Sequence, residues 1–586
     1  MRLRSSNPAR PGEKVSSGSG SDRDRVPRPD QKSAKSDLGT GMALTAIRTS
    51  QRGAENCARF IGSRNSGRTR SRSTTPSFGT VRVLVTITEV GSTLSRVSLE
   101  TSERLVSRRP LAAAHAVAAM VALVVVLALV SGQYGYHRDE LYFRRLPPAW
   151  GYTDQPPFTP LLAHVAVALF GDSVVALRVF AIVFAAASVL ILSLVTREVG
   201  GSRVAQASTA WGMAGATLTL LFGHVLLTAS LDLVVWPAAL LFAIRAVLRG
   251  DGRWWVAAGA IIGASTFNKL LVVILMVAIA AGLAVFGPRR WFASWWLWAG
   301  VAVAGLLALP SVIYQATHGW PQLAMGAALA ENNADEVRIL MWPMLILLVG
   351  PVLAVFWIVG MVGLFRRPTW RPLRFLAVTF VVVVIFVFAA GTQFYYTAGV
   401  LAVLTAIGSA AVADWARTRA RRVLVSVLLA VNAATCAVAS LPVLPVQVFG
   451  ATGLAVINSA AADQVGWERY VEQVTDAAAS TRPDAIITSN YGEAGALDRW
   501  GVDLPPVLSG HNALGDLGGP ADDAERILLV GWQGVRMERW FQACEAAGVL
   551  ENGVGVDNEE QGAPLTVCTG PLEPWDVLWE RFRHLD

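Results

Sequence analysis

The 586-residue sequence is short of charged side chains and of cysteine, which narrows the class of protein it can be. Asp, Glu, Lys and Arg together make up 16% of the residues, whereas soluble domains carry about 25%. Four cysteines are too few to define a disulfide framework. A glycine-rich loop of the kind that cradles nucleotide phosphates is absent from the sequence, which argues against a nucleotide-linked substrate. Hydrophobic residues make up 53% of the chain, and this composition predicts an integral membrane protein.

Long apolar blocks with few charges recur from residue 111 onward. With its flanks, each block is long enough to cross about 30 Å of hydrocarbon, and a series of such blocks cannot be one soluble core. We therefore expect about eleven transmembrane helices, with the short fifth and sixth as the weakest pair. The expected spans are 111–131, 174–195, 205–222, 232–249, 254–268, 270–286, 292–312, 340–364, 374–390, 395–412 and 422–441.

Arginine is concentrated in alternate loops between these spans. Cytoplasmic loops carry an excess of Lys and Arg, so these loops and the N-terminus are expected inside the cell. The prediction is a multi-pass protein of the plasma (inner) membrane with its C-terminal domain outside the cytoplasm. The arginines that carry it are Arg197, Arg203, Arg245, Arg249, Arg253, Arg289, Arg290, Arg366, Arg367, Arg371, Arg374, Arg417, Arg419, Arg421 and Arg422.

The N-terminal segment, residues 1–105, is basic and rich in Ser, Arg, Gly and Pro. It has no signal-peptide layout, because no apolar core follows its first basic residues. Such a segment cannot bury enough apolar surface to offset the entropy of ordering it, so we expect a disordered cytoplasmic tail. Its arginines are not interleaved with aromatic residues as a nucleic-acid surface requires, and no nucleic-acid partner is expected.

Residues 106–444 are expected to form the transmembrane domain, and residues 445–586 a small soluble domain of α/β type. This last segment is acidic and mixes apolar and polar residues, with turn signals at Tyr491-Gly492 and Leu508-Ser509-Gly510. A disulfide between Cys544 and Cys568 is permitted outside the cytoplasm but not required. The expected elements are strands 485–488 and 527–530 and helices 467–479 and 536–547.

The first outer loop, residues 131–158, crowds ionisable and aromatic side chains directly after a membrane helix. Aromatic residues alone would be typical of an interfacial belt, and adjacent acidic residues can begin a helix. Arginines in this outer loop depart from the rule that Lys and Arg are enriched in cytoplasmic loops. A binding site for an anion would be a physical reason for their presence. The two motifs of the loop are Arg138-Asp139-Glu140-Leu141-Tyr142 and Gly151-Tyr152-Thr153-Asp154-Gln155-Pro156-Pro157.

A carboxylate beside cations is what transfer of a sugar from a lipid-linked phosphate requires. The leaving phosphate is a weak base and needs no proton, so one general base acting on the acceptor hydroxyl suffices. Glycoside hydrolysis, in contrast, uses a pair of carboxylates. Cations near the phosphate stabilise its developing charge. Asp139, with Arg138 and Arg144 nearby, matches this requirement.

The order of these motifs after a first span resembles bacterial glycosyltransferases of the C superfamily (GT-C). Within that superfamily, the sequence looks more like the branch that contains the protein O-mannosyltransferases and the lipid A aminoarabinose transferases. The resemblance covers roughly residues 110–586 and implies a mainly α, polytopic fold of GT-C type. In that family an Asp-Glu pair opens the first outer loop, and its Asp is the proposed catalytic base. The resemblance therefore implies this role for Asp139, with Glu140 as its catalytic neighbour.

Two intramembrane charges extend the resemblance. Asp232 starts the fourth span, and Lys269 lies between the fifth and sixth. The family commonly has an Asp at the first position and a Thr-Lys-Tyr-like element at the second, where Leu270 here replaces the aromatic residue. By resemblance, Lys269 holds the lipid phosphate. Snorkelling to the interface is the alternative for both side chains, although intramembrane ionisable residues are functional candidates by default.

Other polar residues are candidates for contacts with the substrates. The outer loop 313–338 contains His318, which is equally well a surface histidine. Polar residues among glycines at 490–496 and 509–512 resemble strings in the soluble domains of actinobacterial-type family members, and they suit either sugar contacts or ordinary turns. The candidate substrate-binding residues are Tyr142, Tyr152, Asp154, Gln155, Asp232, His318, Tyr491, Glu493 and His511.

These observations predict an inverting glycosyltransferase that uses a polyprenyl-phosphate donor at the bilayer surface. The sugar is mannose-like or a pentose, and the acceptor is a protein, a glycolipid or a polysaccharide outside the cytoplasm. No cofactor is firmly implied; a divalent metal is compatible with the loop carboxylates, but no ligand spacing compels a site. The alternative is a transporter or flippase for a lipid-linked or small anionic substrate, although the internal repeats typical of many transporters are not detected.

Overall fold

The computed structural model describes residues 109–533 and 537–586, so the expected basic tail lies outside the described residues. Residues 109–440 are mostly helical, as the sequence predicted. The helices of this part are α2 (Ala113–Val130), α3 (Arg138–Arg145), α4 (Phe158–Phe170), α5 (Val174–Glu198), α6 (Arg203–Ala214), α7 (Thr217–His224), α8 (Thr228–Arg249), α9 (Arg253–Ser265), α10 (Val272–Val285), α11 (Trp295–Thr317), α12 (Pro321–Leu347), α13 (Pro351–Arg366), α14 (Phe375–Ala390), α15 (Ala398–Trp415) and α16 (Arg419–Ser440).

Each expected span falls on one of these helices or on a pair of them, but fewer helices than expected meet the length needed to cross a membrane. Among the described residues, six are long and apolar enough, and a seventh span results if α12 and α13 are counted together. Helices α4, α10 and α14 are apolar but shorter. The protein is therefore a multi-pass membrane protein.

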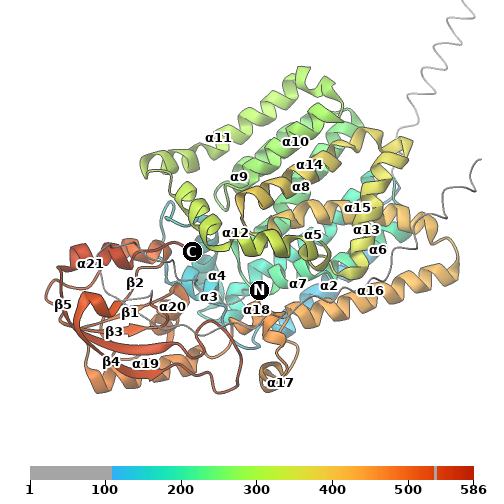
Figure 1. The fold of residues 1–586 in the computed structure, drawn as a ribbon. Coiled ribbons are helices and arrows are strands. Elements are labelled where there is room, and N and C mark those ends of the chain that lie inside the picture. The colour runs from blue at the N-terminus through green and yellow to red at the C-terminus, as the bar shows by residue number, and fades with distance from the viewer. Residues whose placement is uncertain (1–108, 534–536) are drawn as a thin grey trace, which may run out of the picture. The chain divides into compact units, whose positions relative to one another are not determined.

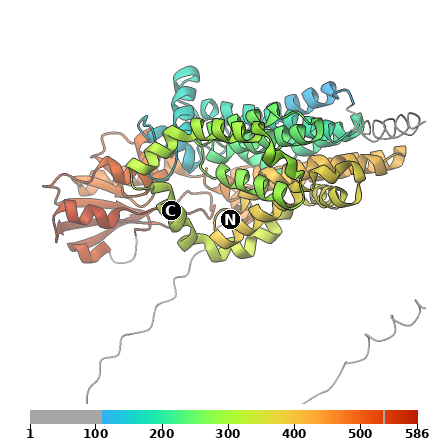
Figure 2. The ribbon, with the colours of Figure 1, turned by 90° about the horizontal axis from the view of Figure 1, so that it is seen from above.

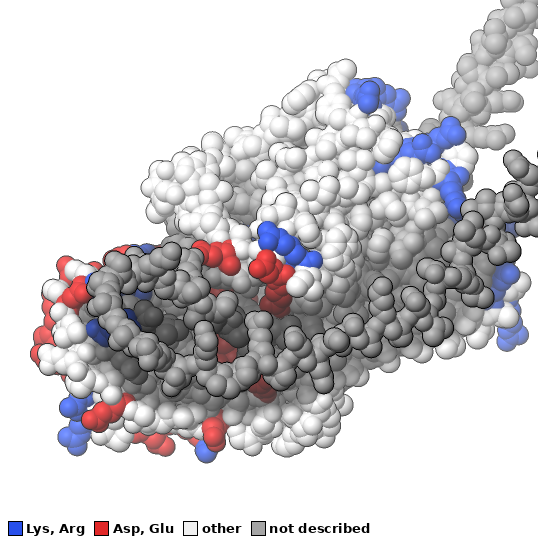
Figure 3. All heavy atoms as spheres, viewed as in Figure 1, with Lys and Arg blue, Asp and Glu red and all other residues white. Residues whose placement is uncertain are grey.

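The helices differ in how much of their surface the rest of the protein covers. Helices α8 and α15 are mostly buried inside the bundle, whereas most of α2, α11 and α16 faces outward. Their outward residues are large and apolar, including Leu129, Leu306 and Val427, as expected for a surface in contact with lipid. Figure 3 shows this helical surface as mostly uncharged; most of its Lys and Arg lie at the ends of helices away from the C-terminal domain, and one group lies beside acidic residues near that domain.

Three expectations about the helical part were wrong. The outer loop 313–338 is largely helical, because α11 extends to Thr317 and α12 begins at Pro321, where proline fits the first turn. The expected span 340–364 is broken, with α12 and α13 bent by 91° around Gly350 and Pro351. The expected span 205–222 is also broken, because α6 ends at Ala214 and α7 starts at Thr217.

The C-terminal part contains a five-stranded mixed sheet with the strand order β2-β1-β3-β5-β4. Strands β2, β1 and β3 run parallel, while β5 is antiparallel to both β3 and β4. Figures 1 and 2 both place these strands together at one end of the helical bundle. The elements are α17 (Val446–Ala451), α18 (Ser459–Ala462), α19 (Trp467–Thr481), β1 (Ala485–Thr488), α20 (Tyr491–Trp500), β2 (Val507–Ser509), β3 (Arg526–Val530), β4 (Phe541–Val549), β5 (Pro564–Pro571) and α21 (Trp575–Phe582).

Helices cover both faces of this sheet. Successive residues of its central strands point to opposite sides, so each strand contributes to the hydrophobic cluster on either face. Ile486 and Leu528 join the hydrophobic cluster formed with α19 and α20. Ile487 and Leu529 join a second cluster with α21 on the other face. The expected strands 485–488 and 527–530 and the expected helix 467–479 are confirmed.

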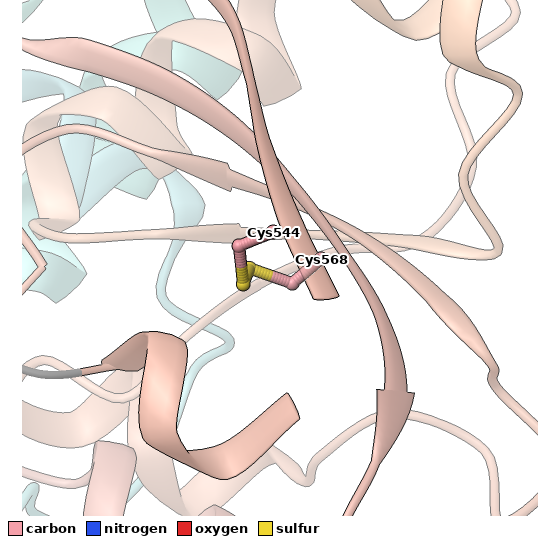
Figure 4. The surroundings of a disulfide bond; sticks show 2 residues. All are labelled: Cys544 and Cys568. Atoms are coloured by element: carbon pink, nitrogen blue, oxygen red, sulfur yellow. A yellow bond between two sulfur atoms is a disulfide. The ribbon is translucent and has the colours of Figure 1, made fainter. Parts of the chain in front are cut away.

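Two expectations about the C-terminal part were wrong. The stretch 536–547 was expected to be helical, but its residues 541–547 belong to the edge strand β4; residue 536 lies outside the described residues. Pairing with β5 overrides the local preference, and Cys544 and Cys568 are directly opposite each other and form a disulfide (Figure 4). Tyr491-Gly492 is not a turn but the first turn of α20.

The short helix α3, which carries the Asp-Glu pair, packs against α20 of the C-terminal part (Figure 1). Two glycines make this approach close. A Cβ atom at Gly495 would lie 2.7 Å from the carbonyl carbon and oxygen of Leu141. A Cβ atom at Gly492 would lie 2.9 Å from the Cβ of Arg138. Leu141 and its neighbours on α3 share one hydrophobic cluster with the sheet, so α3 is part of the C-terminal core as well as of the helical bundle.

Replacing Gly495 with Ala should loosen the contact between α3 and α20. The added methyl group meets backbone atoms, which cannot rotate away, so we expect the free energy of unfolding to fall by about 1–3 kcal/mol. Thermal unfolding in detergent and limited proteolysis of the C-terminal part measure this. Gly326→Ala in α12 is the matched control, because a Cβ there has nothing within 4 Å and alanine favours a helix. Equal melting temperatures for Gly495→Ala and wild type would contradict the expectation.

Candidate functional site

Helix α3 begins with a capping box that explains why an acidic pair stands at its start. The His137 side chain accepts a hydrogen bond from the Asp139 backbone N–H at 3.1 Å. The Glu140 carboxylate accepts one from the His137 backbone N–H at 2.9 Å. Acidic residues in the first turn and arginines in the last turn also match the helix dipole.

The Glu140 carboxylate is fully buried and is held by Arg178 of α5. Arg178 donates to both carboxylate oxygens at 2.9 Å, and the backbone N–H of Leu226 adds a bond of 3.1 Å. With the bond from His137, Glu140 accepts four hydrogen bonds and has no exposed atom to offer a substrate. Arg178 also donates to the carbonyl oxygens of Ser131 and Gly135 and to the side chain of Gln464.

Arg178 was missed in the sequence, although a signal was present. It is a single guanidinium early in an apolar span, and such residues are rare in membrane helices without a partner. In the structure, Glu140 supports the loop through its buried contacts with Arg178, whereas the resemblance implied a catalytic place beside Asp139.

Asp139 points away from this buried pair and remains partly exposed, with 28% of its side-chain surface accessible. Its Oδ1 accepts a hydrogen bond of 2.8 Å from the hydroxyl group of Tyr491, the first residue of α20. The Nδ1 atom of His137 lies 4.0 Å from the same oxygen. Asp139 is therefore the accessible carboxylate of the motif.

The second motif of the loop lies beside Asp139. Tyr142 donates to Asp154 at 2.8 Å, and its ring stacks on Tyr491 at 4.6 Å between centroids. Burial raises the pKa of Asp154 to about 7, and the charge of Asp139 acts in the same direction. Tyr152 and Gln155 shape the loop: Tyr152 donates its hydroxyl proton to the carbonyl of Pro147 and its backbone N–H to the carbonyl of Gln155. Gln155 itself is buried.

Lys269 lies between α9 and α10 and is largely buried. Its Nζ atom is 3.9 Å from a carboxylate oxygen of Asp232 in α8, and it lies over the rings of Tyr395 and Tyr396 at 5.3 and 4.6 Å. Within the described part of the chain this ammonium group makes no hydrogen bond. Asp139 lies within electrostatic range of it. A mostly apolar cavity inside the bundle is lined by Asp232 and both tyrosines.

The two tyrosines beside Lys269 were also missed in the sequence. They belong to a short 3-10 helix, Phe394–Thr397, at the start of α15. Sequence reasoning placed them inside the span 395–412, where aromatic residues are unremarkable. Their cation–π contacts with Lys269 join two segments that are far apart in the sequence, which no local pattern encodes.

The arginines predicted to bind the donor phosphate are already engaged by carboxylates. Arg138 forms ion pairs with Glu559 and Glu560 of the C-terminal part. Arg144 pairs with Asp172 at 2.9 Å and with Asp498 at 2.6 Å. Both guanidinium groups therefore connect α3 to other elements, and neither is left as an open cation.

Three further predicted residues, His318, His511 and Glu493, have different surroundings. His318 lies at the end of α11, exposed, with its ring stacked on Tyr314, and no contact joins it to Asp139. The His511 ring lies at a tilt against that of Tyr491, with 4.6 Å between centroids, and so His511 lies at the site. Glu493 caps α20 by accepting hydrogen bonds from Ser489 and Asn490, which is a structural role.

Metal ligands do not gather at this site. Among the described residues no group of three or more His, Cys, Asp or Glu side chains is arranged to hold a metal ion. The groups that the structure does place at the site are the partly exposed Asp139 carboxylate, the Lys269 ammonium group and several tyrosine hydroxyls.

Residues 154–314 match the family model described as dolichyl-phosphate-mannose-protein mannosyltransferase. The fold is similar to two crystal structures of ArnT from Cupriavidus metallidurans, one bound to undecaprenyl phosphate and one in the apo state. The first has a TM-score of 0.53 at 15% identity and covers 77% of this chain and 97% of ArnT. The second has a TM-score of 0.51 at 14% identity and covers 78% and 98%. No curated protein sequence matches the chain.

These matches confirm the resemblance inferred from the loop motifs. The fold is like that of ArnT, mainly helical with a small C-terminal sheet domain, as the resemblance implied. The chain is similar to the mannosyltransferase family model and to ArnT.

The stability of the C-terminal domain should depend on pH through Glu493. Burial raises the pKa of Glu493 to about 8, with the nearby Glu560 acting in the same direction, and these effects outweigh the hydrogen bonds that favour the charged form. A glutamate in the unfolded chain titrates near 4.3, so the folded state binds the extra proton between about pH 4 and 8. The free energy of unfolding should therefore fall as the pH rises through this window.

Glu493→Gln tests this dependence, because the amide oxygen can still cap α20 while the ionisable group is gone. We expect its melting temperature to fall less than that of wild type between pH 6 and pH 9. Glu472→Gln is the control, since Glu472 is exposed on α19 with 65% of its side chain accessible, and it should follow wild type. Parallel curves for Glu493→Gln and wild type would show that this carboxyl group is not the source.

Proposed function

We propose that the protein is an inverting glycosyltransferase that moves a monosaccharide from a polyprenyl-phosphate donor to an acceptor hydroxyl. The observation that carries the proposal is the combination of a partly exposed carboxylate, Asp139, with a largely buried ammonium group, Lys269, that makes no hydrogen bond within the described residues. A base and an anion-binding cation are the two groups that this reaction needs. The similarity of the fold to ArnT, which has been crystallised with undecaprenyl phosphate, supports the same class of donor.

In the proposed reaction, the acceptor oxygen forms a bond to the anomeric carbon on the face opposite to the phosphate. The bond between that carbon and the phosphate oxygen breaks, and its electron pair stays on the polyprenyl phosphate. Asp139 takes the proton of the acceptor hydroxyl. Lys269 stabilises the charge of the phosphate, with Asp232, Tyr395 and Tyr396 fixing the position of its ammonium group. No arginine is required, because Arg138 and Arg144 are paired with carboxylates.

The contacts of the site also support the proposed orientation in the membrane. Asp139 follows α2, Lys269 follows α9, and Tyr395 precedes α15. An even number of the expected spans separates each of these segments from the next, so all three are expected on the same side of the membrane. Most of the Lys and Arg visible on the helical bundle lie at its other helix ends (Figure 3), which the charge bias assigns to the cytoplasm. We therefore propose that the site and the domain from about residue 445 onward lie outside the cytoplasm.

The sugar and acceptor follow from the resemblance alone. A mannose-like or pentose sugar is proposed from the two branches of the family, and a protein, a glycolipid or a polysaccharide is proposed as acceptor. The donor tail explains why the site is at the membrane: an isoprenoid chain keeps the sugar phosphate at the bilayer surface, where the loop that follows α2 can reach it.

Asp139→Asn tests the proposal with purified full-length protein. The assay measures transfer of radiolabel from polyprenyl-phosphate sugars to a membrane and cell-wall extract. Wild type should label an acceptor, and the variant should be at least about 100-fold slower because its amide cannot take the proton. Thermal unfolding and binding of undecaprenyl phosphate should be unchanged. Asp476→Asn, on the exposed side of α19, is the control and should transfer at the wild-type rate.

Two results would count against the proposal. Transfer by Asp139→Asn at the wild-type rate would remove Asp139 as the base. Folded wild-type protein that binds the lipid phosphate but transfers no sugar from any donor would instead favour a transporter or flippase of lipid-linked substrates.

A further inference from the structure

Helix α20 of the C-terminal domain is fixed against α3 by contacts along its length. Gly492 and Gly495 let the two backbones approach. Arg145 of α3 donates hydrogen bonds to the carbonyl oxygens of Ala494 and Val507, at 3.1 and 2.6 Å. These bonds join the end of α3 to both α20 and β2, so the N-terminus of α20 has a defined place beside the N-terminus of α3.

Arg138 fixes the other end of α3 to the same domain. Its guanidinium group pairs with Glu559 and Glu560, and Glu560 also accepts a hydrogen bond of 3.2 Å from Asn490. Asn490 is the N-cap of α20. The residue before Asp139 and the residue before Tyr491 therefore share one carboxylate, which ties the starts of the two helices together.

This docking places one group of the C-terminal domain, the Tyr491 hydroxyl, in hydrogen-bonding contact with the Asp139 carboxylate. The Tyr491 hydroxyl donates to Oδ1 of Asp139 at 2.8 Å. The Tyr491 ring is held between Tyr142, on which it stacks, and His511, which it meets at a tilt, each at 4.6 Å between centroids. Within the described residues, the second oxygen of Asp139 accepts no hydrogen bond from a side chain or backbone group, so one oxygen is anchored and the other is available.

We propose that Tyr491 is a positioning residue for Asp139, so that the C-terminal domain completes the catalytic site. The inference rests on the proposed function of Asp139 as the base. A hydrogen bond from a neutral hydroxyl to a carboxylate fixes its rotamer and favours its charged form. Tyr491 thereby presents the free oxygen of Asp139 to the acceptor hydroxyl in the form that can take a proton.

Tyr491→Phe removes only the hydroxyl group and keeps the stacked ring. Compared with wild type, we expect kcat to fall about 10- to 100-fold, the range expected for losing a hydrogen bond to a charged group. The KM for the donor should stay constant, because Lys269 is untouched. The acidic limb of the kcat/KM pH profile should move to higher pH, since the charged carboxylate has lost a donor.

Tyr470→Phe is the matched control. Tyr470 is another buried tyrosine of the same domain, and its hydroxyl contacts Asn558 and Asn552 rather than the site. We expect some loss of thermal stability from this variant but an unchanged pH profile. A general weakening of the domain would affect both variants alike, so the pH profile separates positioning from structural support.

A double-mutant cycle provides the decisive comparison. If Tyr491 acts through Asp139, Tyr491→Phe causes no further loss in the Asp139→Asn background. An equal additional loss in that background, or a Tyr491→Phe variant with wild-type kcat and pH profile, overturns the inference while the proposed function stands. A change in acceptor KM with unchanged kcat also overturns it, because it would make Tyr491 a substrate contact. Wild-type activity in Asp139→Asn overturns the proposed function itself.

Discussion

The buried ion pair between Glu140 and Arg178 is the interaction on which the rest of the site depends. Two opposite charges without solvent access are stable only when their remaining hydrogen-bonding capacity is filled. Glu140 meets this condition with backbone donors from the α3 N-terminus and from the segment before α8, and Arg178 with backbone carbonyls of the loop after α2. The pair therefore joins four segments of the chain at one point, and it fixes the start of α3 on the membrane helices.

Because the start of α3 is fixed in this way, Asp139 and Glu140 point in different directions. Successive residues of a helix point in directions about 100° apart, so when Glu140 is turned into the protein Asp139 faces outward. The C-terminal domain then meets α3 from that outward side, with Tyr491 on Asp139 and the arginines of α3 paired with acidic residues. The arginines of the loop pair with acidic residues and so hold the loop and the domain together, and the proposed anion site is Lys269 instead.

Much of the fold could be predicted from sequence, because apolar blocks and short β-branched strands have a strong local signal. The strand 485–488 was predicted to the residue. In contrast, residues 541–547 look helical in isolation and become a strand only through pairing with β5. The site followed the same rule. Asp139 and Lys269 stood out as charges in apolar surroundings, whereas the partners of Glu140, the tyrosines beside Lys269 and the docking of Tyr491 depend on contacts between distant segments.

The central claim is that the paired acidic residues divide their work, with Glu140 supporting the loop and Asp139 acting on the substrate. Glu140→Gln tests it most directly when its thermal unfolding is measured in detergent beside that of Asp139→Asn. Removing one partner of a buried ion pair costs about 3–5 kcal/mol, so the melting temperature of Glu140→Gln should be well below that of wild type. The melting temperature of Asp139→Asn should equal that of wild type. A Glu140→Gln protein that is as stable as wild type but transfers no sugar would contradict the account, because Glu140 would then belong to the chemistry.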